Sequence, residues 1–125
     1  MLLKLIGLAV IGALGTLARY GLGGLIHRAA GEGFPWGTLV VNVAGCFLFG
    51  LFWAAAEHRF SFSPEIRTVV LVGFMGSFTT FSTFAFETVQ LLRDAQWGTA
   101  AINIAAQNLT GLAALFLGLA AGRAV

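Results

Sequence analysis

The chain has 125 residues, of which 58% are hydrophobic and only 10% are charged. That fraction of charged residues is too small for the surface of a water-soluble domain of this size, so lipid must be the main solvent. The formal net charge of +2 forms no basic patch, which excludes nucleic acid as a partner.

Four segments carry little charge, and each approaches the ~20 residues that cross a hydrocarbon core. We expect an all-α fold with transmembrane helices near residues 3–26, 36–56, 68–91 and 97–121. These spans leave no room for a soluble domain, so residues 1–125 form a single transmembrane domain. The connections between the spans are short, which favours antiparallel neighbouring helices.

The first two spans each contain one polar residue whose role the sequence leaves open. Arg19, in the first span, either extends its head group to the membrane surface or raises the anion concentration at a pore mouth. Asn42, in the apolar second span, needs hydrogen-bond partners inside the bundle. A bond between helices is the simpler interpretation of Asn42, and a donor to a passing anion is the functional one.

The third span departs from a regular helix between residues 73 and 84, which read GFMGSFTTFSTF. Glycines followed by hydroxyl residues continue a helix poorly, so we predict a break in the middle of the membrane. Carbonyl groups freed by a break must face protein, water or an ion, because lipid cannot satisfy them.

Aromatic residues in the same segment could contact an anion. Phe81 and Phe84 are three residues apart, so their rings share one face of a helix, and Phe78 extends the spacing. The positive edge of an aromatic ring stabilises an anion weakly, and weak binding favours conduction. The alternative is ordinary core packing. Glu87 follows in this span, and we leave its role open.

Polar residues also recur in the fourth span. Asn103, Gln107 and Thr110 follow helical spacing, whereas Asn108 points elsewhere. We expect a polar track beside a pore along this face.

The sequence offers no metal-ligand cluster and no nucleophile with a nearby base, and His27 and His58 lie in the expected connections. The sequence therefore lacks the reactive groups that an enzyme would need, whereas permeation needs only ordered donors and acceptors.

Basic residues are divided between the two ends of the expected bundle. The end with both termini carries Lys4, Arg59, Arg67 and Arg123. The opposite end carries Arg28 and Arg93, with Arg19 if it reaches that surface. This bias is weak, so insertion in both orientations is possible. Because four short helices enclose little volume, we expect a homodimer to complete any aqueous path.

Residues 37–42, GTLVVN, and residues 73–84 closely resemble the Fluc, or CrcB, fluoride channels. The segment from Gly15 to Tyr20 and the spacing from Gly111 to Gly118 agree as well. The resemblance covers nearly the whole chain.

The resemblance implies a dual-topology homodimer of antiparallel subunits, with two fluoride pores and a central structural sodium ion. It places Asn42, Phe81 and Phe84 along the pores, with Ser82 and Thr83 as hydroxyl donors. Further pore candidates are Thr38, Arg19, Asn103 and Gln107. The backbone carbonyls of Gly76 and Thr79 would bind the sodium ion. This chain departs from the family at Asn103 and Gln107, where many members carry tyrosine and serine.

The implied function is passive fluoride efflux through a prokaryotic inner membrane, which lowers cytoplasmic fluoride and its toxicity. The alternative is a small multidrug-type proton-coupled exporter, but such exporters carry a glutamate in the first span, and residues 3–26 have none. A third class, a non-transporting membrane subunit, would use Asn42 and the glycines only for packing.

Overall fold

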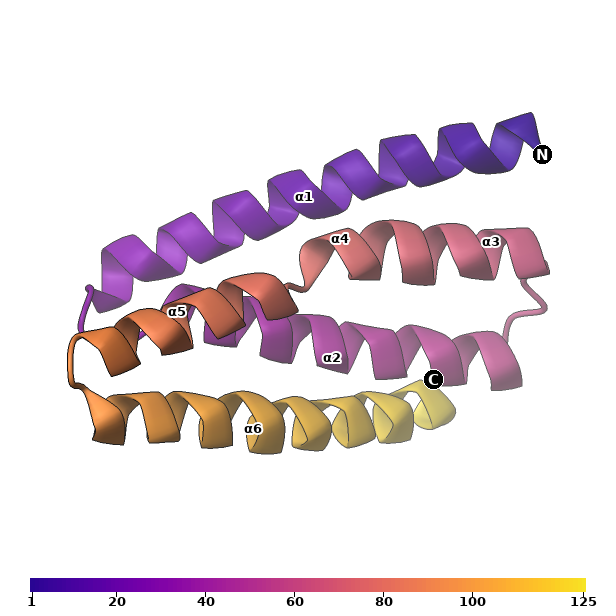
Figure 1. Ribbon diagram of the computed structural model, residues 1–125. Helices are drawn as coiled ribbons and strands as arrows, with labels where there is room; N and C mark the ends of the chain where they lie inside the picture. The colour runs from indigo at the N-terminus through magenta and orange to yellow at the C-terminus, as the bar shows by residue number, and fades with distance from the viewer.

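The computed structural model contains helices and short connections only, and it describes every residue. The helical segments in chain order are α1 (Leu2–Ala30), α2 (Trp36–His58), α3 (Pro64–Thr68), the π-helical segment η1 (Val69–Met75), α4 (Gly76–Phe78), α5 (Phe81–Arg93) and α6 (Trp97–Ala124) (Figure 1). Four stretches are long and apolar enough to cross a membrane: Leu2–Ala30, Trp36–His58, Pro64–Arg93 and Trp97–Ala124. This confirms the predicted all-α, multi-pass membrane protein.

The observed helices extend a few residues beyond the predicted spans. As a result, the prediction that the histidines lie in connections was wrong: His27 is in the last turn of α1, and His58 is the last residue of α2. Arg28 also lies in the last turn of α1, where a positive charge suits a helix C-terminus.

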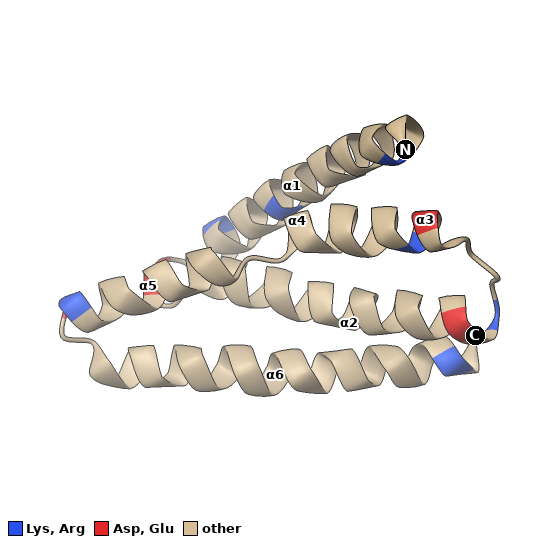
Figure 2. Ribbon diagram, turned by 45° about the vertical axis from the view of Figure 1, so that its right-hand side comes forward, with Lys and Arg blue, Asp and Glu red and all other residues tan.

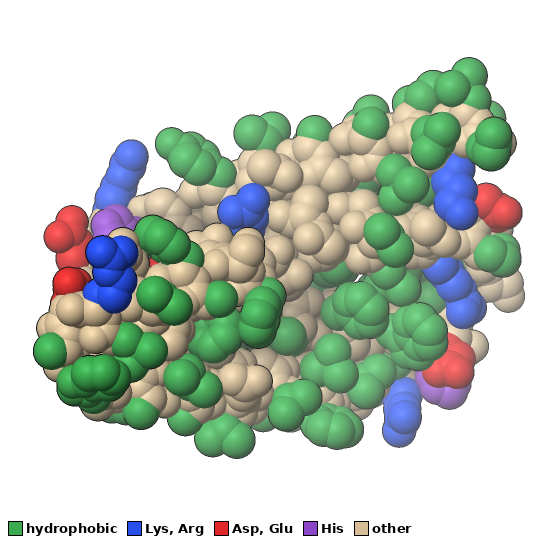
Figure 3. Space-filling view, in the orientation of Figure 1, with side chains coloured by type: hydrophobic (Ala, Val, Ile, Leu, Met, Phe, Trp, Pro, Cys, Tyr) green, Lys and Arg blue, Asp and Glu red, His purple; other side chains and the backbone are tan.

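Consecutive spans run antiparallel, with both termini and the α2–α3 connection at one end of the bundle, so α1 runs parallel to the third span and α2 runs parallel to α6 (Figure 1). Helix α2 packs along α6, while α1 packs against η1 and α4. Charged positions gather mainly near the two ends (Figure 2), and many side chains on the visible face between them are apolar (Figure 3). Such an outer surface suits lipid or another membrane helix.

Glycines bring α2 and α6 into backbone contact. A Cβ atom added to Gly118 would overlap the carbonyl oxygen of Phe47 and lie 2.9 Å from the amide nitrogen of Leu51. On the facing helix, a Cβ atom on Gly50 would lie 2.8 Å from the amide nitrogen of Leu119. Small residues therefore allow the backbones of this pair to approach closely.

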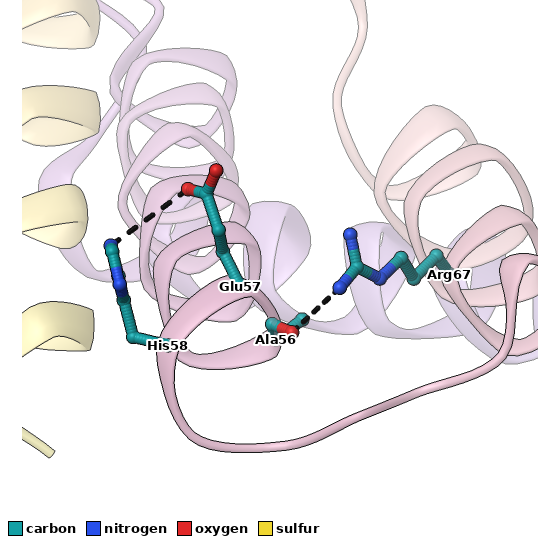
Figure 4. Close-up of polar contacts among 4 residues, drawn as sticks. All are labelled: Ala56, Glu57, His58 and Arg67. Atoms are coloured by element: carbon teal, nitrogen blue, oxygen red, sulfur yellow. Dashed lines mark hydrogen bonds and ion pairs between the residues drawn. The ribbon is translucent and has the colours of Figure 1, made fainter.

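Hydrogen bonds fix both ends of the connection between α2 and α3. The Nη2 group of Arg67 donates to the carbonyl oxygen of Ala56 at 2.7 Å, which places a positive charge near the C-terminus of α2 (Figure 4). Helix α3 starts at Pro64, and the hydroxyl of Ser63 accepts a hydrogen bond from the Ile66 amide at 3.3 Å. The third span thus enters the bundle at a defined position.

The third span breaks between α4 and α5, as predicted. Thr79 and Thr80 are extended, with ψ angles of 156° and 108°. The two glycines of the segment do not cause the break, because Gly73 lies within η1 and Gly76 has a helical φ of −64°. Thr80 instead begins the new helix by accepting a hydrogen bond from the Thr83 amide at 3.2 Å, as threonine commonly does at this position.

Candidate functional site

The side chain of Asn42 binds the backbone at the helix break. Its Oδ1 accepts from the amide of Thr80 at 2.8 Å, and its Nδ2 donates to the carbonyl of the same residue at 3.1 Å. Nδ2 also donates to Oε1 of Gln107 at 3.1 Å. Both N–H groups of Asn42 are therefore engaged within the chain, so this residue acts here as the bond between helices that the sequence left as one of two alternatives.

The free donor of this network belongs to Gln107. Its side chain is only 9% exposed, and its Nε2 group has no hydrogen-bond partner in the chain. Because Oε1 already accepts from Asn42, the amide is oriented with its NH₂ group toward any additional acceptor. A buried donor without a partner is costly, so an anion or water that reached this group would be stabilised.

Two backbone carbonyls at the break lose their usual partners to side chains. In a continuous helix, the amide of Thr80 would donate to the carbonyl of Gly76, but here it donates to Asn42. Likewise, the amide of Thr83 would donate to the carbonyl of Thr79, but it donates to the Thr80 hydroxyl. The oxygens of Gly76 and Thr79 are thus free to accept from another group.

Phe81 and Phe84 form an edge-on pair on α5, with ring centroids 5.4 Å apart and planes inclined at 63°. Phe84 is 8% exposed, whereas Phe81 is 77% exposed. Phe78 does not extend this aromatic face, because the break intervenes and its ring stacks on Phe74 at 5.6 Å. Phe81 and Phe84 are therefore the predicted aromatic residues that stay together at the start of α5.

These groups surround a hollow of about 390 Å³, which we call the central hollow. Its lining includes Asn42, Gly76, Thr79, Phe81, Phe84 and Gln107. The structure thus brings together six of the predicted pore and sodium residues from three helical spans. Asn108, which the sequence suggested would point elsewhere, also lines this hollow, although its Nδ2 donates to the Ile104 carbonyl of its own helix.

A second hollow of about 310 Å³, which we call the polar hollow, is lined by a different set of residues that shares Thr80 with the first. Its lining includes Arg19, His27, Thr38, Thr80, Thr83 and Glu87. Thr80 lines both hollows, so the broken span contributes to each of them.

The hydroxyl groups of the polar hollow differ in their freedom to donate. Thr38 donates to Oε1 of Glu87 at 2.8 Å, so its only O–H group is in use. Thr83 accepts from the Thr80 hydroxyl at 2.9 Å, which leaves its own hydrogen available. Ser82 is exposed and lies 3.4 Å from the Thr80 hydroxyl. Thr83 is the better placed of the two predicted hydroxyl donors.

The predicted polar track on the fourth span does not continue as expected. Asn103 is fully buried and donates to the Thr88 hydroxyl at 3.0 Å, and it lines neither hollow. Thr110 is exposed and donates to a carbonyl of its own helix. Only Gln107 of the three reaches the central hollow, because the buried face of α6 continues through Gly111 against α2.

Two residues of the network were missed in the sequence, namely Thr80 and Thr88. Thr80 had a recognisable signal, since threonine is common at the residue before a helix, where its hydroxyl accepts from a backbone amide two or three residues later. Thr88 lies seven residues after Phe81 and four after Phe84, so it shares their helix face. Its hydroxyl donates to the Phe84 carbonyl at 2.8 Å. It links Asn103 to the aromatic pair.

An all-α membrane protein with uncharged donors around a broken span belongs, as a class, with channels and transporters. The family described as "CrcB-like protein, Camphor Resistance (CrcB)" matches residues 6–119. The chain therefore belongs to the CrcB family.

Several relatives match over most or all of their length. A fluoride-specific ion channel FluC of Nitrosococcus oceani is 58% identical over 115 residues, covering 92% of each chain. A protein of the same name from Solidesulfovibrio magneticus is 54% identical over 125 residues, covering 100% of both chains. One from Nitratidesulfovibrio vulgaris is 53% identical over 122 residues and covers 98% of both.

Proposed function

We propose that this chain is a fluoride-specific ion channel that lets fluoride cross the membrane passively. The observation that carries the proposal is the central hollow, whose lining brings the unpartnered amide of Gln107 and the rings of Phe81 and Phe84 together at the broken span. This arrangement occurs in a chain that matches proteins named fluoride-specific ion channels over its full length. We therefore assign the central hollow to the fluoride path.

Uncharged donors suit a conducting site better than a lysine or arginine would. An amide N–H and an aromatic edge replace part of the hydration shell of the anion, yet they hold it weakly enough for release. Thr83 and Arg19 in the polar hollow would receive the anion on one side of the break. The positive charge of Arg19 raises the local anion concentration there.

A second copy of the chain would complete the path. Phe81 is 77% exposed although it lines the central hollow, so one chain leaves this part of the site open. We propose an antiparallel homodimer, in keeping with the weak charge bias between the two ends. A dual-topology test is direct: with Cys46→Ser and Ser61→Cys, an impermeant thiol reagent added to cells should label about half of the chains. Labelling of all or none would contradict dual topology.

We also propose that the carbonyls of Gly76 and Thr79 bind a structural sodium ion. The residues fit this role, because both oxygens lack their usual backbone donors, and unwound helix carbonyls are suitable sodium ligands. Each copy would contribute one such pair. Bound sodium would supply positive charge that holds the broken ends together without being transported.

Fluoride efflux would protect a prokaryotic cell whose inner membrane holds the protein. Neutral hydrogen fluoride crosses membranes, dissociates in a less acidic cytoplasm and is trapped there as the anion. A passive path lets the trapped fluoride leave down its gradient. No energy source is needed for this direction.

The test uses purified protein in liposomes loaded with potassium fluoride or potassium chloride, with valinomycin to balance charge. We expect fluoride release well above that of empty vesicles and little chloride release. Fluoride release equal to that of empty vesicles would overturn the proposal. Transport of a cationic drug that depends on a proton gradient would instead favour the exporter, for which Glu87 in the polar hollow is the available carboxylate.

A further inference from the structure

Arg19 contacts the broken end of α4. Its Nε group, on α1, donates to the carbonyl oxygen of Ser77 at 3.0 Å. In a continuous helix this carbonyl would accept from the amide of Phe81, but the extended residues between α4 and α5 remove that partner. The guanidinium group thus replaces a missing backbone donor, and its positive charge suits the C-terminal end of a helix.

The backbone around this hydrogen bond is closely packed. Gly15 lies one turn before Arg19 on the same face of α1, and a Cβ atom there would overlap the Ser77 hydroxyl and the Phe74 carbonyl. The Ser77 hydroxyl itself is turned back onto its own helix, 2.7 Å from the Gly73 carbonyl. Since α1 and α4 approach this closely, the arginine side chain reaches the Ser77 carbonyl from a fixed position.

Two side chains from different helices therefore hold the two sides of the break. Arg19 holds the end of α4 through Ser77, and Asn42 holds the start of α5 through Thr80. The free carbonyl of Gly76 directly precedes Ser77 in the chain. A shift of Ser77 would move this carbonyl and alter the approach of α5 to the central hollow.

We propose that Arg19 is a positioning residue for permeation, acting through the Ser77 carbonyl and not through its charge alone. This rests on the proposed function, because the break forms part of the fluoride path. The competing explanation is that Arg19 only attracts anions, since it also lines the polar hollow. Lysine separates the two explanations, because it keeps the charge but lacks the planar guanidinium that places Nε at this carbonyl.

The experiment compares wild type, Arg19→Lys, Arg19→Gln and the control Arg28→Lys, which alters an exposed arginine at the end of the same helix. Fluoride efflux is measured at low and high ionic strength. If Arg19 positions the break, Arg19→Lys loses about tenfold in efflux rate, as expected for removal of a charged hydrogen bond, and added salt leaves this ratio unchanged. If Arg19 only attracts anions, Arg19→Lys retains wild-type efflux, and the loss in Arg19→Gln shrinks as salt screens the charge in the wild type. That second result would overturn the proposal.

A spectroscopic measurement tests the hydrogen bond without relying on transport. Labelling with carbonyl-¹³C serine and ¹⁵N phenylalanine selects two peptide bonds, Ser61–Phe62 and Ser77–Phe78. We expect the Ser77 carbonyl signal of the reconstituted protein to shift in Arg19→Lys, while the Ser61 signal stays in place. An unchanged Ser77 signal would overturn the proposal even if fluoride efflux fell. Failure of the wild type to transport fluoride would instead overturn the proposed function, and the two failures are thereby distinguished.

The folded state of each variant is checked by size-exclusion chromatography and thermal unfolding. Folded Arg19→Lys protein with reduced efflux and a shifted Ser77 signal supports the positioning role. If Arg19→Lys does not fold while Arg28→Lys does, Arg19 is needed for assembly itself, and a role confined to positioning is overturned.

Discussion

The amide of Asn42 forms two hydrogen bonds with a single residue, Thr80, one to its N–H group and one to its carbonyl. Changing Asn42 to Asp keeps the shape and the acceptor but removes both donations from Nδ2. The Asn42→Asp protein should lose about 1–3 kcal/mol of stability and most of its fluoride efflux, because the start of α5 and the orientation of Gln107 are no longer fixed. Thermal unfolding and liposome efflux measure the two effects.

The matched control for this change is Thr110→Val, which removes a polar group from an exposed position whose hydroxyl bonds only its own helix. It should unfold and transport like the wild type. An Asn42→Asp protein with wild-type unfolding and efflux would contradict the role assigned to the Asn42 amide.

The Gln107 amide gives a separate prediction, because its Nε2 is a buried side-chain donor without a partner, on a residue that lines the central hollow. Gln107→Met keeps a similar length and removes this donor, so fluoride efflux should fall by about tenfold. Gln107→Glu should reduce efflux further, since it places a negative charge beside the anion. Asn108→Met is the control, because Asn108 already donates to its own helix. Wild-type efflux from Gln107→Met would exclude Gln107 as a direct donor.

The aromatic pair predicts a separation between stability and transport. Phe84→Ile should cost about 1–3 kcal/mol because the ring is buried, whereas Phe81→Ile should cost much less in a chain where that ring is 77% exposed. Both variants should conduct fluoride poorly, since isoleucine has no positive ring edge. The ring-edge explanation fails if Phe81→Ile folds and conducts like the wild type.

Much of this fold could be predicted because hydropathy alone sets the four spans, and the glycines and hydroxyl residues between 73 and 84 favour a break, although the break falls at the threonines and not at the glycines. The partners of the polar groups could not be predicted in this way. Asn42 reaches Gln107 across 65 residues, and Thr38 reaches Glu87 across 49, so packing decides which donors stay free. Helical spacing grouped Thr110 with Asn103 and Gln107, yet Gly111 continues the buried face because α6 packs closely on α2.

The close contact between α2 and α6 gives the last prediction. At Gly118 a Cβ atom would overlap the Phe47 carbonyl oxygen and approach the Leu51 amide nitrogen to 2.9 Å. Backbone atoms cannot move aside as a flexible side chain can, so Gly118→Ala must separate the helices and should cost about 1–3 kcal/mol.

Gly98 provides the comparison, because it lies in the same helix with no atom within 4 Å of an added Cβ. Gly98→Ala should therefore leave stability unchanged or raise it by up to about 1 kcal/mol, as alanine favours a helix. Thermal unfolding of both variants in the same detergent measures the difference. If the two proteins unfolded at the same temperature, the helices would be free to separate at little cost, and backbone contact would not be what holds α2 against α6.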